Sequence, residues 1–226
     1  MDRDEVQRKT LSISENNSGQ QSQISTLTTA MFDFDEKEFN KTLSINILQL
    51  GMEQTTTQII FPFLQHVGIL WLGGSIHIAH EHFITNLIKQ RMFVAIDQVN
   101  VVPNSDAKKY LLFLPNGENH ELSLLFASYL LRANGQHVIY LGTSTPLDDL
   151  NKIHKIHNPD FVFCALTNSN AAIPVQVYLN TLSRSWPNTQ IIVTGSQVVK
   201  RRDLKIPENC KVMSDPSGFL DFIVNN

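Results

Sequence analysis

The hydrophobic positions of this chain repeat with two different periods, and the period changes near residue 103. Between residues 23 and 103, apolar side chains recur every three to four positions, a spacing typical of amphipathic helices. Short turn-forming or glycine-containing breaks divide this region into four segments; they lie at 33–35, 51 and 73–74. The pattern therefore predicts a four-helix bundle over residues 23–103.

The second half of the chain, residues 107–226, follows the turn sequence Pro103-Asn104-Ser105-Asp106. Here short continuous apolar runs alternate with amphipathic stretches. The runs predict strands at 110–114, 137–141, 161–166, 191–194 and 211–213. Buried strands that alternate with helices are typical of a parallel sheet covered on both faces. The predicted fold class is therefore α plus α/β: a four-helix bundle followed by a doubly wound, Rossmann-like or flavodoxin-like domain.

Composition restricts the classes of function. The 226 residues are 42% hydrophobic and 17% charged, which suits one or two soluble domains, and residues 1–22 are polar enough to predict a linker or disorder. The net charge of −3 gives no basic field for nucleic acid, and two cysteines make no disulfide framework. No signal-peptide core or membrane-spanning run is present, so we expect a cytoplasmic protein without a membrane partner.

One strand end carries candidate metal chemistry. The strand at 110–114 runs into a turn that presents Glu118 and His120, and ligands of open α/β sheets bind beyond the carboxyl ends of strands. A neutral imidazole is a good ligand for transition metals, and a nearby carboxylate can accept its other N–H. By itself a Glu-x-His pair favours a solvated turn that holds an acid and a histidine by chance, so the prediction needs a longer pattern.

That longer pattern lies downstream of His120. Forty residues separate Ser123 from Cys164-Ala165-Leu166, and twenty-seven separate Leu166 from Thr194-Gly195. This closely resembles the cobalamin-binding signature Asp-x-His-x-x-Gly, Ser-x-Leu and Gly-Gly. The resemblance implies that His120 is the lower axial ligand of cobalt, with Glu118 behind it. It also implies that the displaced dimethylbenzimidazole tail of the cofactor lies in a slot beside the first strands, formed by Ser123, Cys164, Leu166, Thr167, Thr194 and Gly195.

Four positions depart from that signature. Glu118 stands where the family has Asp, Cys164 where it has Ser, and Ser123 and Thr194 where it has Gly. All the replacements in the slot are small, so the slot can persist. Ser123 and Thr194 nevertheless add bulk where glycine lets the nucleotide pass close to the backbone.

The helical region carries a second signature. Trp71 is followed, after nine residues, by Glu81-His82. This is similar to the pattern of the CarH-type, MerR-like regulators that use adenosylcobalamin. The resemblance implies that the bundle covers the upper corrin face, with Trp71 beside the adenosyl group and Glu81 and His82 supporting the pocket. The alternative from the residues alone is that Trp71 is core and Glu81 caps the positive end of its helix. Leu72 stands where light-responding relatives carry a histidine, which favours ligand sensing over light sensing.

The resemblance thus implies a sensor module of a transcriptional regulator. Such a module binds a corrinoid, changes its state of homo-oligomerisation to a dimer or tetramer, and reaches DNA only through a helix-turn-helix domain that residues 1–22 cannot supply. Two alternatives stay open: a corrinoid carrier of a methyltransferase system, and a dimerisation module that has lost cobalamin. Because no nucleophile–base set can be assembled from the residues, we predict that the chain is not an enzyme.

Overall fold

The computed structural model of the protein describes residues 19–103, 105–169 and 173–225. The chain divides into two compact units, Met1–Arg91 and Met92–Asn226. The first is helical and the second contains a single sheet. The predicted linker or disordered segment, residues 1–22, lies outside the described residues except for 19–22, which belong to the first helix.

The helical unit starts with a helix over residues 19–32 and continues through α2 (Glu36–Thr55), η1 (Thr56–Ile60), α3 (Phe61–Leu72) and α4 (Ile78–Asp97). Residues 92–97, the end of α4, belong to the second unit. Asp35 caps α2, because its side chain accepts a 2.9 Å hydrogen bond from the Glu38 backbone N–H. Gly51 interrupts α2 with a φ of 79°, a conformation that glycine adopts without steric cost. The break predicted at this glycine is therefore present, and η1 is a π-helical turn that leads into α3.

Packing inside the helical unit joins elements that are far apart in sequence. The Phe39 ring of α2 meets the Phe63 ring of α3 at 5.8 Å, and Arg91 Nε of α4 donates to Asn40 Oδ1 at 3.2 Å. The fourth helix begins later than a cap at Ser75 would place it. It starts at Ile78, where the His80 imidazole Nδ1 accepts a hydrogen bond from the His77 N–H at 3.1 Å.

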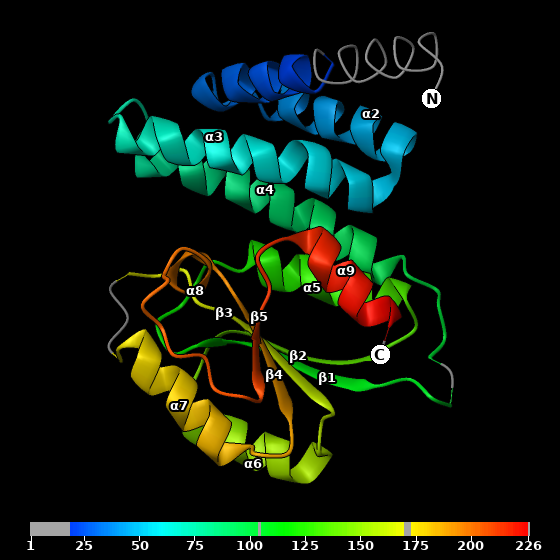
Figure 1. Ribbon diagram of the computed structural model, residues 1–226. Helices are drawn as coiled ribbons and strands as arrows, with labels where there is room; N and C mark the ends of the chain where they lie inside the picture. Colours follow the sequence, from blue (N-terminus) through cyan, green and yellow to red (C-terminus); the bar gives the residue numbers. More distant parts are fainter. Residues whose placement is uncertain (1–18, 104, 170–172, 226) are drawn as a thin grey trace, which may run out of the picture. The chain divides into compact units, whose positions relative to one another are not determined.

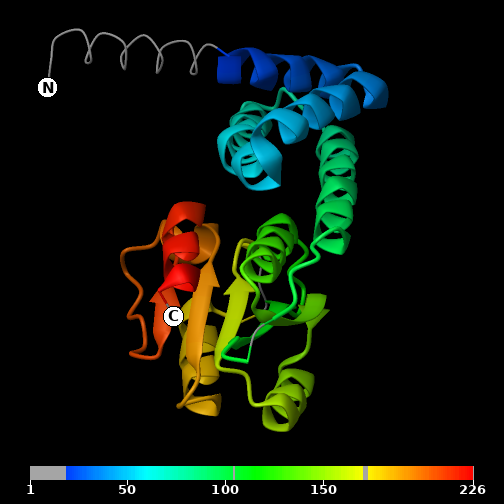
Figure 2. The same ribbon diagram turned by 90° about the vertical axis from the view of Figure 1, so that its right-hand side faces the viewer.

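The sheet unit has five parallel strands in the order β2-β1-β3-β4-β5. Their bounds are β1 (Lys109–Pro115), β2 (His137–Thr145), β3 (Phe161–Ala165), β4 (Gln190–Thr194) and β5 (Cys210–Val212). Figure 2 shows β3 and β4, coloured yellow and orange, pointing the same way, so their carboxyl ends meet at one edge of the sheet. The middle residues of β1, β3 and β4 are buried, as their apolar runs predict.

Helices cover both faces of this sheet: α5 (Leu122–Ala133) and α9 (Pro216–Val224) lie on one face, and α6 (Leu147–His157) and α7 (Val175–Ser185) on the other (Figure 1). The short helix α8 (Ser196–Val199) follows β4. Phe161 and Phe163 of β3 contact the rings of Phe222 and Phe219 of α9. The alternate residues of β3 enter the core that Leu150 of α6 and the apolar face of α7 complete.

The predicted fold class is confirmed. All five predicted strands form with bounds no more than one residue from those predicted, except that β2 extends four residues further than expected. The strand order is that of flavodoxin-like folds, with the change of direction between β1 and β3. In the part of the chain that the structure describes, no helix is long and apolar enough to cross a membrane.

Candidate functional site

The candidate site lies where the strand order reverses. The chain leaves β1 towards β2 on one side, and the next crossover places β3 on the other side of β1. The loop after β1 and the loop after β3 therefore flank the same crevice, the usual ligand site of such sheets. The first loop holds Glu118 and His120, and the second holds Thr167 and Asn168.

The Glu118 carboxylate joins these two loops. Its Oε1 accepts hydrogen bonds from the backbone N–H groups of Asn119 and His120, both at 3.0 Å. Its Oε2 accepts from the backbone N–H groups of Thr167 at 2.7 Å and Asn168 at 2.6 Å. Asn168 also returns a hydrogen bond, from Nδ2 to the Gly117 carbonyl at 3.1 Å. The buried Glu118 carboxylate and the Asn168 amide thus hold the β1 loop against the β3 loop.

The environment of Glu118 keeps this carboxylate ionised. Burial would raise its pKa, but the hydrogen bonds from the His120 side chain and from the backbone of Asn168, His120 and Thr167 outweigh burial and lower the pKa to about 2. The group is therefore an anion near neutral pH. It is 4% exposed, so its charge is balanced by these donors rather than by water.

His120 is held by this anion. Its Nδ1 lies 2.6 Å from Glu118 Oε1, while 59% of its side chain is exposed. A carboxylate in this position selects the tautomer in which Nδ1 carries the proton, so Nε2 has the lone pair that a metal needs. The contact therefore orients the His120 ring with Nδ1 towards Glu118.

The predicted slot residues fall into two groups. Leu166, Thr167, Thr194 and Gly195 lie together at the carboxyl edge of β3 and β4, where the Leu166 N–H donates to the Thr194 carbonyl at 2.8 Å. Gly195 has a φ of 101°, and a Cβ there would lie 2.4 Å from the Leu166 carbonyl oxygen. Glycine is required at this position because backbone meets backbone.

The other two slot residues lie elsewhere in the unit. Ser123 is half-buried in the first turn of α5. Cys164 is fully buried in the core on the α6–α7 face, and burial raises the pKa of its thiol. Thr194, one of the positions where the signature has glycine, turns its hydroxyl towards β5 and donates to the Met213 carbonyl at 2.8 Å.

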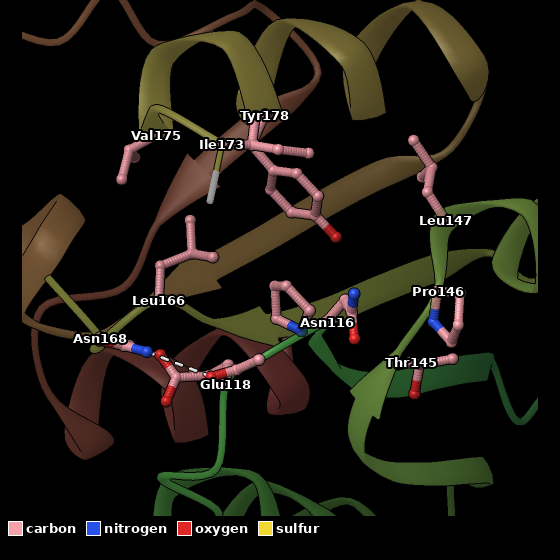
Figure 3. Close-up of a pocket in the computed structure, with 12 residues that line it drawn as sticks. Asn116, Glu118, Thr145, Pro146, Leu147, Leu166, Asn168, Ile173, Val175 and Tyr178 are labelled. Atoms are coloured by element: carbon pink, nitrogen blue, oxygen red, sulfur yellow. Dashed lines mark hydrogen bonds between the residues drawn. The ribbon is translucent and has the colours of Figure 1, made fainter. Parts of the chain in front are cut away.

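A cavity of about 200 Å³ opens beside Glu118 at the same edge (Figure 3). Its lining is mainly apolar and comes from the ends of β1, β2 and β3 and from α7; Glu118 and Leu166 belong to it, and so do Asn168 and Tyr178. The sequence reasoning did not identify Asn168 or Tyr178. Asn168 could have been found, because a polar residue just after a strand end shares the edge with Glu118. Nothing in the sequence distinguishes Tyr178, because it lies on the apolar face of a helix with other core residues.

In the helical unit, the three predicted residues flank the connection between α3 and α4. Trp71 is 47% exposed near the end of α3, and the following Leu72 is 88% exposed. Glu81, in the first turn of α4, accepts from Thr85 Oγ1 at 2.8 Å and pairs with His82 Nδ1 at 2.8 Å. The carboxylate therefore has polar partners of its own within α4.

Among the described residues, no group of three or more His, Cys, Asp or Glu side chains could hold a metal ion. His120 with Glu118 is accordingly a single nitrogen donor backed by a carboxylate.

Comparison with known proteins relates this chain to proteins that bind B12. Residues 23–95 match the protein family described as B12 binding domain. This segment is the helical part of the chain, from the first helix into α4. The match is thus to the unit that carries Trp71, Glu81 and His82 rather than to the sheet.

Two curated relatives make the resemblance specific. The chain is 25% identical over 167 residues to the HTH-type transcriptional repressor CarH of Myxococcus xanthus, an alignment that covers 74% of this chain and 55% of the relative. It is 26% identical over 146 residues to the HTH-type transcriptional repressor CarA of the same organism, covering 65% of this chain and 48% of the relative. The chain thus spans about half the length of these relatives, and the predicted resemblance to CarH-type regulators is confirmed.

A solved structure shows the same fold. The monomethylamine corrinoid protein of Methanosarcina barkeri superposes with a TM-score of 0.70, covering 91% of this chain and 98% of that one, at 10% sequence identity. At this identity the likeness speaks for the architecture alone, a helical region followed by a five-stranded parallel sheet.

Proposed function

We propose that this chain is the corrinoid-sensing module of a transcriptional regulator. In this proposal it binds a cobalamin, with His120 as the lower axial ligand of cobalt. Binding changes the state of homo-oligomerisation, and a DNA-binding domain in the same regulator responds. The sequence similarity to two HTH-type repressors supports this function over other uses of the same fold.

The observation that carries the proposal is the Glu118–His120 pair. An imidazole whose Nδ1–H donates to a buried, ionised carboxylate is a strengthened donor at Nε2. In a bound corrinoid, His120 would hold the cobalt, and Glu118 would hold the His120 ring. Glu118 also anchors the β1 loop on the β3 loop, so the donor is positioned before the ligand arrives.

The remaining site residues are proposed to hold the rest of the cofactor. Ser123, Cys164, Leu166, Thr167, Thr194 and Gly195 would form the slot for the nucleotide tail. Trp71, Glu81 and His82 would meet the upper face of the corrin and an adenosyl group. The indole of Trp71 and the side chain of Leu72 form exposed apolar surface. Burial of this surface against a large ligand would favour binding.

The proposal is tested by reconstitution. Purified protein is incubated in the dark with adenosylcobalamin and desalted, and its absorption spectrum and its molar mass by light scattering are measured. We expect retained corrinoid absorption and a larger assembly. His120→Ala should weaken retention, while His137→Ala, an exposed histidine at the start of β2, should leave it unchanged. Protein that desalts colourless would refute cobalamin binding.

A corrinoid carrier for methyl transfer is the second candidate, because the fold is shared with the monomethylamine corrinoid protein of Methanosarcina barkeri. A carrier presents a methyl group on cobalt to partner enzymes, so its upper face must open. The observation that separates the two is the assembly state on binding adenosylcobalamin. A carrier would stay in the same state and exchange methyl groups with a partner protein, whereas the proposed sensor would assemble.

A further inference from the structure

The cavity beside Glu118 is lined by a tyrosine whose hydroxyl has no hydrogen-bond partner among the described residues. This residue, Tyr178, is 7% exposed, and its hydroxyl is buried. In Figure 3 the ring extends from α7 and the hydroxyl points into the cavity. A buried hydroxyl normally has a partner, because burying an unsatisfied one costs free energy. The exception here faces a space that a ligand can enter.

The shape and lining of the cavity restrict what that ligand is. The walls are largely apolar, contributed by Pro115, Pro146, Leu147, Leu166, Ile173 and Val175. The Glu118 carboxylate also lines the cavity, which disfavours an anion. Its oxygens already accept hydrogen bonds from the backbone on both sides, so it has little need of a cation. A space of about 200 Å³ admits a molecule of one or two rings.

The cavity is not simply the slot predicted from the sequence. Of the six predicted slot residues, Leu166 is among the lining residues and Ser123, Cys164, Thr167, Thr194 and Gly195 are not. Ser123 belongs to α5, on the opposite face of the sheet from α7. The cavity does touch the slot at Leu166, and it touches the proposed cobalt ligand through Glu118.

We propose that this cavity binds an uncharged planar ring carrying a hydrogen-bonding substituent, which the Tyr178 hydroxyl recognises. Two sources supply this chemistry: the lower base of a bound corrinoid, or a free heteroaromatic molecule. In the first case Tyr178 selects corrinoids whose base bears a hydroxyl or amino group over those whose base bears methyl groups, and this source rests on the proposed function. In the second case the ring is a separate ligand. It would contact Glu118 in the cavity lining, and Glu118 is hydrogen-bonded to His120.

A matched pair of probes isolates the hydrogen bond. 5-Hydroxybenzimidazole and 5-methylbenzimidazole have the same shape and differ in one hydrogen-bonding group. Their dissociation constants are measured by titration calorimetry with the wild type, with Tyr178→Phe, and with Tyr129→Phe. Tyr129 lies in α5 and outside the cavity lining, so the third protein is the control.

We expect the wild type and Tyr129→Phe to bind the hydroxylated probe about tenfold more tightly than the methylated one, the effect of one hydrogen bond. Tyr178→Phe should bind both with similar affinity. Ligand-free Tyr178→Phe should unfold at the same temperature as the wild type or higher, because the hydroxyl it loses has no partner. No saturable binding of either probe, a preference that survives in Tyr178→Phe, or a lower unfolding temperature would each overturn the proposal.

Preloading the protein separates the two sources. If the corrinoid base fills the cavity, cobalamin abolishes probe binding while cobinamide, which lacks the nucleotide tail, leaves it intact. If the ring is a separate ligand, the probe binds whether the protein is preloaded with cobalamin or with cobinamide. Whether either corrinoid binds is read independently from its absorption. Binding of cobalamin without binding of either probe would refute this inference and leave the proposed function standing. Binding of a probe without binding of any corrinoid would refute the proposed function and leave this inference standing.

Discussion

Replacing Glu118 by glutamine is the most informative single change in the sheet unit, because it keeps the shape of the side chain and removes half of its acceptors. Each carboxylate oxygen accepts from backbone N–H groups: Oε1 from Asn119 and His120, and Oε2 from Thr167 and Asn168. An amide has one oxygen and one NH₂ group. Whichever way the amide is oriented, two backbone donors face another donor.

The magnitude follows from those two donors. A buried donor that loses its partner costs about 1–3 kcal/mol, and these donors are partly buried. We therefore expect Glu118→Gln to lower the free energy of unfolding of the sheet unit by about 2–4 kcal/mol. Glu208→Gln, at an exposed position, should change it by less than about 0.5 kcal/mol.

The assay is equilibrium unfolding in urea, followed by tryptophan fluorescence. The chain has two tryptophans, Trp71 in the helical unit and Trp186, which is 3% exposed in the core of the sheet unit. A Trp71→Phe background makes Trp186 the reporter, so the transition belongs to the sheet unit. If Glu118→Gln unfolds at the same urea concentration as Glu208→Gln, the two loops are not held by this carboxylate and the account of the site is wrong.

Two further predictions concern the same unit. Gly195→Ala would place a Cβ 2.4 Å from the Leu166 carbonyl oxygen at a φ of 101°, so the free energy of unfolding of the sheet unit should fall by about 3 kcal/mol or more. A loss below about 1 kcal/mol in urea unfolding would refute the close approach. Gly68→Ala in α3, with open space and an ordinary helical backbone, should raise the free energy of unfolding of the helical unit by about 0.5–1 kcal/mol. Burial lowers the pKa of His154 below 6.5, so the unfolded chain binds more protons than the folded one and stability should fall as the pH drops through and below 6.5. His154→Gln should reduce this loss in urea titrations between about pH 7.5 and pH 5, while His157→Gln on the exposed side of the same helix should keep it, and equal slopes in the two variants would contradict the assignment.

Much of the fold could be predicted because its signals are local. Apolar runs gave the strands to within a residue or two at most ends, and Asp35 and Gly51 marked helix limits through capping and a positive φ. The start of α4 could not be predicted in this way. It depends on the His80 imidazole accepting from the His77 N–H, a contact that competes with a serine cap and that no residue preference indicates.

In the candidate site, too, the local features could be predicted and the long-range contacts could not. The neighbourhood of Glu118 and His120 follows from their spacing on one turn. The contacts of Glu118 with Thr167 and Asn168 join segments that are 49 and 50 residues apart, and they depend on the strand order, which the sequence pattern leaves open. Tyr178 illustrates the limit further, since its apolar ring belongs to the core of α7 while only the three-dimensional structure shows that its hydroxyl faces a cavity.

The most direct test of the account is the electron paramagnetic resonance spectrum of the protein with bound cob(II)alamin, prepared with histidine labelled with nitrogen-15. The unpaired electron of this cobalt couples to its axial nitrogen, which splits each line into a triplet for ordinary nitrogen and a doublet for nitrogen-15. With His120 as the axial ligand we predict doublets in the labelled wild type, and triplets from the cofactor's own base in labelled His120→Ala. Triplets in the labelled wild type would show that the base stays on cobalt, and would contradict the role assigned to His120.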